Sequence, residues 1–251
     1  MKIIGVIPAR YASTRFPGKP LADICGKPMI WWVYQQAKKV KEFSEVYIAT
    51  DDVKITNELD KLDIPHVMTK DNHPDHIARI HEVSEKINSD LYVCINGDEP
   101  LIDPISISDV IKYAINKTTP AYYGAFRYLT DPAETIDPAK IKVLTNKEDR
   151  LIYISRTPIP YPKNSLLFKY KKYVGIECYY KQTLDFFVSH NMGEVEKIED
   201  IDHLRFIENG YPLYFTEVKS ESISVDTPKD LEKVRKIIAE KIEKGELSLC
   251  Q

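Results

Sequence analysis

Three basic residues, Arg10, Arg15 and Lys19, lie within ten positions of one another, directly after an apolar run that begins at Ile3. No acidic residue occurs between Pro8 and Ala22. An apolar, β-branched run followed by small, hydroxyl and basic residues indicates a buried strand that leads into an anion-binding loop. Guanidinium and ammonium groups form charge-assisted hydrogen bonds with phosphate oxygens. We therefore expect this loop to bind a nucleoside triphosphate.

The loop matches neither of the common phosphate-binding motifs. Its residues fit neither Gly-x-x-x-x-Gly-Lys-Ser/Thr nor Gly-x-Gly-x-x-Gly, so a P-loop kinase and a dinucleotide-binding domain both lose their main support. The simplest alternative is a solvated basic loop after an ordinary first strand. Several loop residues are small enough for backbone N–H groups to approach a phosphate, namely Ala9, Ala12, Ser13 and Gly18.

Two carboxylates are placed where they could hold a divalent cation against phosphate oxygens. Asp98 follows the apolar run 91–95, and Asp226 precedes Thr227 and Pro228. Either one alone is weak evidence, because Asp-Glu-Pro is a normal turn and Asp before Thr-Pro is a normal helix start. Together with a triphosphate loop they predict Mg²⁺ bound by Asp98 and Asp226.

Composition limits the class of protein. The chain has 251 residues, 43% of them hydrophobic, and a net charge of −3, which suits one large folded domain and provides no basic field for nucleic acid. No apolar run approaches the ~20 residues that span a bilayer, and the first run is too short for a signal peptide, so we expect no membrane association and a cytoplasmic location. The four cysteines form no Cys-x-x-Cys pair, which argues against a zinc ribbon or a disulfide framework.

The elements that must position these residues alternate between strand and helix. The runs 46–50 and 91–95 are typical of buried strands, 66–68 of a short strand, and 29–40, 54–62 and 77–87 of helices. This alternation predicts an α/β fold of three layers, Rossmann-like, with a mostly parallel central sheet. Ligands of such sheets lie beyond the carboxyl ends of the strands, where both the basic loop and Asp98 fall.

The pattern changes after residue 121. Short strands are predicted at 122–127, 141–144 and 151–155, followed by a proline-rich stretch and a further strand at 172–180. We interpret residues 1–251 as a single domain with an antiparallel insertion at about 122–180. Helices at 181–189, 202–208 and 228–242 and a strand at 214–217 complete the predicted elements.

The segment from Pro8 to Leu21 resembles the signature of the 3-deoxy-manno-octulosonate (Kdo) cytidylyltransferases, and 97–100 and 225–228 match two further blocks of that family. The resemblance implies transfer of CMP from CTP to an acidic sugar acceptor with release of pyrophosphate, Mg²⁺ on Asp98 and Asp226, and a homodimer formed through the insertion. It implies catalytic roles for Asp98, Arg10 and Lys19. The residues that it places at the nucleotide are Pro8, Ala9, Arg10, Ser13, Thr14, Arg15, Lys19, Asn96 and Gly97.

The acceptor side departs from the family pattern. Members usually carry Ser-Gly-Thr-Asp/Glu-Arg after the histidine that corresponds to His73, and this chain has Asp-His-Ile-Ala-Arg at 75–79. Other family positions also differ, which favours an altered acceptor over drift in a true Kdo enzyme. Asp75 and His76 can hydrogen-bond groups that Ser-Gly would only make room for. The predicted acceptor-binding residues are Asp75, His76, Arg79, Arg156, Tyr173, Asp202 and His203.

Two other functions remain open at this stage. One is a cytidylyltransferase for a phosphate or phosphonate acceptor, in which Arg79, Arg156 and His76 would meet a dianion. The other is an inactive nucleotide-binding subunit, against which Asp98 and Asp226 count. A metal cluster built on His73, His76, His81 and Asp75 is disfavoured, because no second pair with ligand-like spacing accompanies them. The identity of the acceptor stays open.

Overall fold

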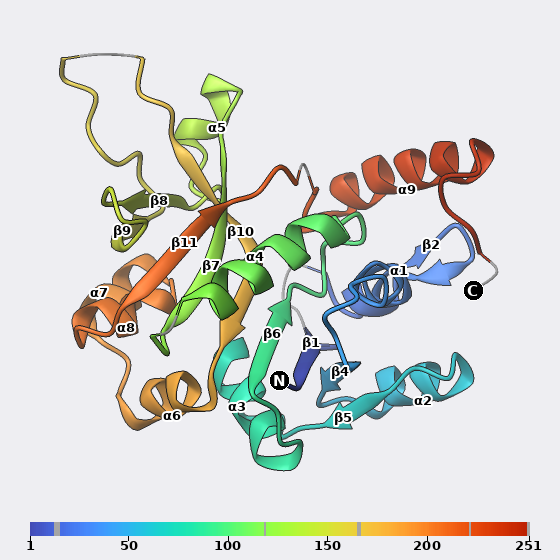
Figure 1. Ribbon diagram of the computed structural model, residues 1–251. Coiled ribbons are helices and arrows are strands. Elements are labelled where there is room, and N and C mark those ends of the chain that lie inside the picture. The colour runs from blue at the N-terminus through green and yellow to red at the C-terminus, as the bar shows by residue number, and fades with distance from the viewer. Residues whose placement is uncertain (13–15, 118, 165–166, 221, 250–251) are drawn as a thin grey trace.

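The computed structural model describes residues 1–12, 16–117, 119–164, 167–220 and 222–249. Its centre is a nine-stranded sheet whose main path runs β11-β7-β10-β6-β1-β4-β5 (Figure 1). The path strands are β1 (Ile3–Ala9), β4 (Glu45–Thr50), β5 (His66–Met68), β6 (Leu91–Ile95), β7 (Tyr122–Tyr128), β10 (Lys171–Tyr179) and β11 (Leu213–Glu217). The other strands are β8 (Lys142–Thr145) and β9 (Leu151–Ser155), which extend this sheet, and the small pair β2 (Asp23–Ile24) and β3 (Lys27–Pro28).

Helices cover both faces of the sheet, so the predicted three-layer α/β fold is confirmed. Apolar side chains of α1, α2, α4 and α9 form one core with the sheet, and those of α3, α6 and α8 form the other. The helices are α1 (Met29–Ala37), α2 (Val53–Lys61), α3 (His76–Lys86), α4 (Pro104–Asn116), α5 (Pro132–Ile136), α6 (Lys181–Ser189), α7 (Glu194–Glu199), α8 (His203–Glu208) and α9 (Pro228–Glu243), with a 3₁₀ turn at Lys19–Leu21.

Strand directions follow the sequence pattern in the first half of the chain, and the strands at 122–179 pair antiparallel to one another as predicted, but their place in the sheet differs from the expectation. β1 pairs in parallel with β4 and β6, and β4 with β5, as expected. The predicted insertion at 122–180 is not a separate unit, since β7 and β10 lie inside the central sheet and β10 is antiparallel to β6, β7 and β8. β8, β9, α5 and the described parts of the segment between β9 and β10 project to one side (Figure 1).

One long helix, α4, was not predicted although the sequence carries its signals. Asp103 caps the helix by accepting from the backbone N–H groups of Ile105 and Ser106, and Pro104 occupies its first turn. Apolar residues at helical spacing, Ile107, Val110, Ile111 and Ala114, are fully buried against the sheet. Among the described residues, no helix is long and apolar enough to cross a membrane.

Candidate active site

A cleft of about 460 Å³ opens beyond the carboxyl ends of β1 and β6. Parallel strands that end side by side bring their following loops together, so the basic loop and the Asn96–Asp98 turn lie next to each other. Ser13, Thr14 and Arg15 lie outside the described residues. The cleft is lined by Pro8, Ala9, Arg10, Ala12, Lys19, Pro20, Met29, His76, Arg79, Asn96, Gly97 and Asp98.

Lys19 connects the two predicted metal-binding carboxylates. Its Nζ lies 2.7 Å from Asp98 Oδ2 and 3.7 Å from Asp226 Oδ1. The backbone holds the two acidic segments together, because Val225 N–H donates to the Asp98 carbonyl at 2.9 Å. Asp98, Asp226 and Lys19 therefore meet at one point, although 128 residues separate the two carboxylates in the sequence.

Two glycines make this arrangement possible. A Cβ on Gly97 would lie 2.6 Å from the Pro8 carbonyl oxygen, closer than real atoms approach, so only glycine lets the turn before Asp98 contact the loop after β1. Gly18 adopts φ +69°, a left-handed conformation that favours glycine, and its N–H closes the basic loop onto the Tyr11 carbonyl at 2.9 Å.

The opposite end of the cleft contains a buried polar network centred on Glu177, a residue that the sequence analysis missed. Glu177 is fully buried in β10. Its only sequence signal is its position as the single acidic residue in the otherwise apolar and aromatic stretch 174–179. Its Oε1 lies 2.7 Å from His203 Nε2, 2.5 Å from Tyr173 Oη and 3.4 Å from Tyr122 Oη. Its Oε2 lies 2.9 Å from His76 Nε2 and 2.8 Å from Tyr179 Oη.

Four of the predicted acceptor residues meet in this network. His76, at the start of α3, bonds Glu177 through Nε2 and lies 3.1 Å from Asp202 Oδ2 through Nδ1. Tyr173 and His203 both donate to Glu177. Burial alone would lower the pKa of His76, but the Glu177 and Asp202 carboxylates raise it well above its usual value. Burial alone would raise the pKa of Glu177, and the two histidines hold it well below its usual value.

The structure corrects the expectation that two arginines are available to an acceptor. Arg79 is 1% exposed, and its guanidinium donates to Asp51 Oδ2 at 2.6 Å and to Thr69. Arg156 donates to backbone carbonyls of Pro138, Glu199 and Asp200. Both guanidinium groups therefore connect segments of this chain.

Asp75 is also committed to the fold. It caps α3 by accepting from Ala78 N–H at 2.7 Å, and its second oxygen lies 3.3 Å from Arg205 NH2. Asp75 is 5% exposed, so the proposal that it recognises the acceptor directly is corrected, whereas the neighbouring His76 lines the cleft. The remaining nearby histidines pair elsewhere, His73 with Glu82 and His81 with Asp185.

The raised pKa of His76 predicts how stability depends on pH. Above about pH 6.5 the imidazole is neutral in the unfolded chain and charged in the folded one, so folding takes up a proton. We expect the free energy of unfolding to fall by up to about 1.4 kcal/mol per pH unit from pH 6.5 towards the folded pKa. The pKa of Glu177 is lowered in the folded protein, so its contribution to the free energy of unfolding is lost only as the pH falls below about 4.5.

Urea unfolding of the wild type and of His76→Gln at pH 6.5, 7.5 and 8.5 measures this dependence. In the His76→Gln variant, the free energy of unfolding should no longer show the part of its fall with pH that His76 causes. The control variant His190→Gln, which replaces a ring that stacks on Phe186, should keep that fall. Equal slopes for the wild type and His76→Gln would contradict the assignment.

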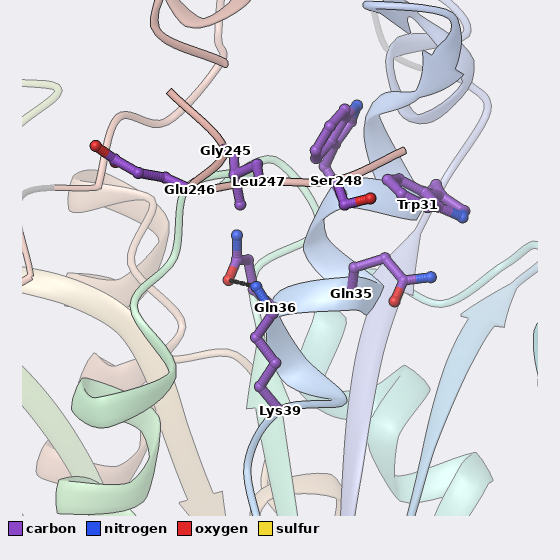
Figure 2. A pocket seen from close by; sticks show the side chains of 9 residues that line it. Trp31, Gln35, Gln36, Lys39, Gly245, Glu246, Leu247 and Ser248 are labelled. Carbon is purple, nitrogen blue, oxygen red and sulfur yellow. Dashed lines mark hydrogen bonds between the residues drawn. The ribbon is translucent and has the colours of Figure 1, made fainter. Parts of the chain in front are cut away.

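A second cavity, of about 150 Å³, lies between α1 and the C-terminal segment (Figure 2). Its wall consists of tryptophan and glutamine side chains of α1 and residues 245–248. The hydrogen bond in it, from Lys39 Nζ to Gln36 Oε1 at 3.2 Å, joins two residues of the same face (Figure 2). Among the described residues that line this cavity, Glu246 is the one carboxylate, whereas Asp98 and Asp226 face each other across Lys19 at the first cleft.

Comparison with known proteins agrees with this geometry. Residues 4–237 match the family model described as cytidylyltransferase. A 3-deoxy-manno-octulosonate cytidylyltransferase of Escherichia coli is 36% identical over 96% of this chain and 98% of its own, and one from Fusobacterium nucleatum is 38% identical over 96% and 98%.

Solved structures of nucleotidyltransferases are also similar to this chain. CMP:2-keto-3-deoxy-manno-octonic acid synthetase complexed with CTP superposes with a TM-score of 0.92 at 35% identity, covering 96% of this chain and 100% of the other. A putative glucose-1-phosphate thymidylyltransferase from Bacillus anthracis, with a TM-score of 0.64 and 15% identity over 94% of each chain, shares the fold alone. The matches extend over nearly the whole chain and include its basic loop and both acidic turns, so this chain belongs to the cytidylyltransferase family, among the 3-deoxy-manno-octulosonate cytidylyltransferases.

Proposed function

We propose that this chain transfers CMP from CTP to a 3-deoxy-2-ulosonic acid, Kdo or a close relative, and releases pyrophosphate. The observation that carries the proposal is the meeting of Lys19, Asp98 and Asp226 at the mouth of a cleft that begins with a basic loop. The chain's likeness to a synthetase complexed with CTP supports the nucleotide, and the names of its relatives support the acceptor.

The reaction is a substitution at the α-phosphorus of CTP. A hydroxyl oxygen of the acceptor forms the new P–O bond, the bond to the β-phosphate oxygen breaks, and the hydroxyl proton passes to a nearby carboxylate or to water. Arg10 and Lys19 bind the phosphates and hold them in line for attack, which supplies positioning and electrostatic stabilisation of the developing charge. Asn96 and Gly97, on the adjacent turn, complete the nucleotide end of the cleft.

The residues at the mouth fit a magnesium ion. Asp98 Oδ1 is buried and has no hydrogen-bond partner within the part of the chain that the structure describes, and an unsatisfied buried carboxylate oxygen is costly unless a cation meets it. Asp98 and Asp226 would hold the ion. When bound, Mg²⁺ neutralises charge on the phosphate oxygens.

A phosphate or phosphonate acceptor is less well supported. It would need cations for a dianion, and two of the three candidates, Arg79 and Arg156, already bond groups of this chain. His76 also contacts two carboxylates, but its side chain is 26% exposed against 1% for Arg79, so one accessible cation faces that end of the cleft among the described lining residues.

The test combines binding and turnover. Isothermal calorimetry should detect tighter binding of CTP than of ATP in the presence of Mg²⁺, and pyrophosphate release should require CTP, Mg²⁺ and a 2-ulosonic acid together. Equal affinity for ATP and CTP would refute the nucleotide assignment. Release with a phosphonate and none with any ulosonic acid would refute the acceptor, and no release with either class would indicate an inactive subunit.

Removal of the loop cation should weaken nucleotide binding. Lys19→Met removes one charge-assisted hydrogen bond and leaves Asp98 and Asp226 facing the triphosphate, so we expect the Kd for CTP to rise at least about 10-fold. Lys229→Met, which removes an exposed lysine of α9, is the matched control and should leave the Kd unchanged. Calorimetry measures both, and an unchanged Kd for Lys19→Met would remove Lys19 from the site.

We also propose a homodimer and a cytoplasmic location. Large apolar side chains are exposed around β8, β9 and the following loop, where a groove of about 440 Å³ opens, as a subunit interface requires. Light scattering would test the homodimer. The exposed apolar residues are Ile136, Ile152, Tyr161, Leu167 and Phe168.

The cysteines bear on the cytoplasmic location. The described cysteines, Cys25, Cys94 and Cys178, are free thiols, which suits a reducing compartment.

A further inference from the structure

We infer that His76 is the cation that contacts the acceptor's carboxylate and that Glu177 is the residue that positions it. This inference rests on the proposed function and deepens it, because it assigns the acceptor end of the cleft to His76, which departs from the family pattern, and to Glu177, which bonds the His76 ring. Glu177 touches no part of the cleft itself and acts through the His76 ring.

Few of the cations that line the cleft can contact the carboxylate of the acceptor. The described lining contains four basic side chains, Arg10, Lys19, His76 and Arg79. Lys19 contacts Asp98 and Asp226, and Arg79 is paired with Asp51 below the surface. Arg10 belongs to the basic loop, at the nucleotide end. His76 is paired too, but one of its two partners, Asp202, has a side chain that is 26% exposed, so His76 is the cation that an anionic acceptor can reach at this end.

The two ring nitrogens of His76 have different environments. Nε2 donates at 2.9 Å to Glu177, whose side chain is 0% exposed, so this bond is inaccessible to a substrate. Nδ1 lies 3.1 Å from Asp202, whose side chain is 26% exposed. An incoming carboxylate can replace Asp202 at Nδ1 while Glu177 keeps the ring in place. This arrangement separates an anchoring bond from an exchangeable one.

Both ring nitrogens of His76 face carboxylate oxygens, which only accept hydrogen bonds, so the geometry favours the doubly protonated ring. Glu177 and Asp202 touch the ring directly, and together they raise the pKa of His76 well above its usual value. Both N–H donors therefore persist through the neutral range, and acceptor binding should not depend on the titration of a free imidazole. The other titratable or charged groups around the network are Asp75 on the residue before α3, Cys94 on β6, Tyr122 on β7, Tyr173 and Tyr179 on β10, and His203 and Arg205 on α8.

The central test is Glu177→Gln, which keeps the shape of the side chain and removes its charge. The KM for Kdo should be flat between pH 6 and 8 in the wild type. In the variant it should rise about 10-fold over the same range as His76 loses its proton, while the KM for CTP changes less than about 2-fold. A flat KM for Kdo in a folded Glu177→Gln protein, equal to that of the wild type, would overturn the inference.

The matched control is Tyr179→Phe. It also removes a hydrogen bond to Glu177 Oε2 but leaves the carboxylate and its contact with His76, so it should lower thermal stability and keep the flat pH profile. If Glu177→Gln does not fold, His76→Gln provides the second variant. It should raise the KM for Kdo at least about 10-fold at every pH, and an unchanged KM would refute the contact.

A measurement without turnover separates this inference from the proposed function. In the proton NMR spectrum of the wild type, the ring resonances of His76, assigned by comparison with His76→Gln, should not titrate between pH 6 and 8, and addition of Kdo should shift them. Titration near pH 6.5 would overturn the role of Glu177 even if the enzyme makes CMP-Kdo. Conversely, absence of pyrophosphate release with every ulosonic acid would refute the proposed function, whatever the NMR result for His76.

Discussion

The Asp98→Asn variant should lose about 10²- to 10³-fold in kcat while keeping its fold. Asp98 lies at the mouth of the cleft, where Oδ2 meets Lys19 at 2.7 Å and Oδ1 has no hydrogen-bond partner in the described part of the chain. The substitution keeps the volume of the side chain and removes the charge that a magnesium ion and Lys19 share. Steady-state pyrophosphate release and a thermal melt measure the two effects.

A carboxylate elsewhere on the surface provides the control for Asp98→Asn. Asp109→Asn removes an exposed acidic group of α4 that does not line the cleft, and turnover should stay within about 2-fold of the wild type. If Asp98→Asn kept near-normal turnover at saturating Mg²⁺, the metal assignment at this carboxylate would be wrong.

Arg79→Ala should cost about 3–5 kcal/mol of stability. The guanidinium is 1% exposed and bonds Asp51, which is 12% exposed, so removal of the arginine leaves a largely buried carboxylate without its partner. The same substitution removes the hydrogen bond to Thr69. Guanidinium chloride unfolding measures the loss.

The double variant Arg79→Ala/Asp51→Ala distinguishes an unpaired charge from lost packing. It should recover part of the loss, because both charges are then absent. The role assigned to Arg79 would be wrong if the single variant kept wild-type stability and instead raised only the KM for the acceptor, as the original expectation from the sequence implied.

Periodic segments of this chain could be predicted closely because their signals are local. The strands at 66–68, 91–95 and 151–155 and the helix at 181–189 were predicted at their observed bounds. The positions of the basic loop and of Asp98 followed from one rule, that ligands lie at the carboxyl ends of parallel strands. The central placement of β7 and β10 could not be predicted, because strand pairing depends on partners far apart in the sequence.

The acceptor end of the site was predicted only in part. His76, Tyr173 and His203 were singled out because they depart from the family pattern, but the residue that joins them, Glu177, is 101 positions from His76 and carries no motif. Arg79 and Arg156 look available in the sequence, since nothing local indicates that Asp51 and the 199–200 carbonyls meet them. Burial and long-range pairing, rather than residue type, decide which polar side chains can face a substrate.

Phosphorus NMR of the wild-type protein incubated with CTP, Mg²⁺ and Kdo tests nucleotidyl transfer most directly. We expect the three CTP resonances to be replaced by one phosphodiester resonance and that of pyrophosphate, in equal molar amounts, and Kdo to be consumed at the same rate. CTP that stays intact, or that is converted to CDP and inorganic phosphate with Kdo unchanged, would contradict nucleotidyl transfer to this class of acceptor.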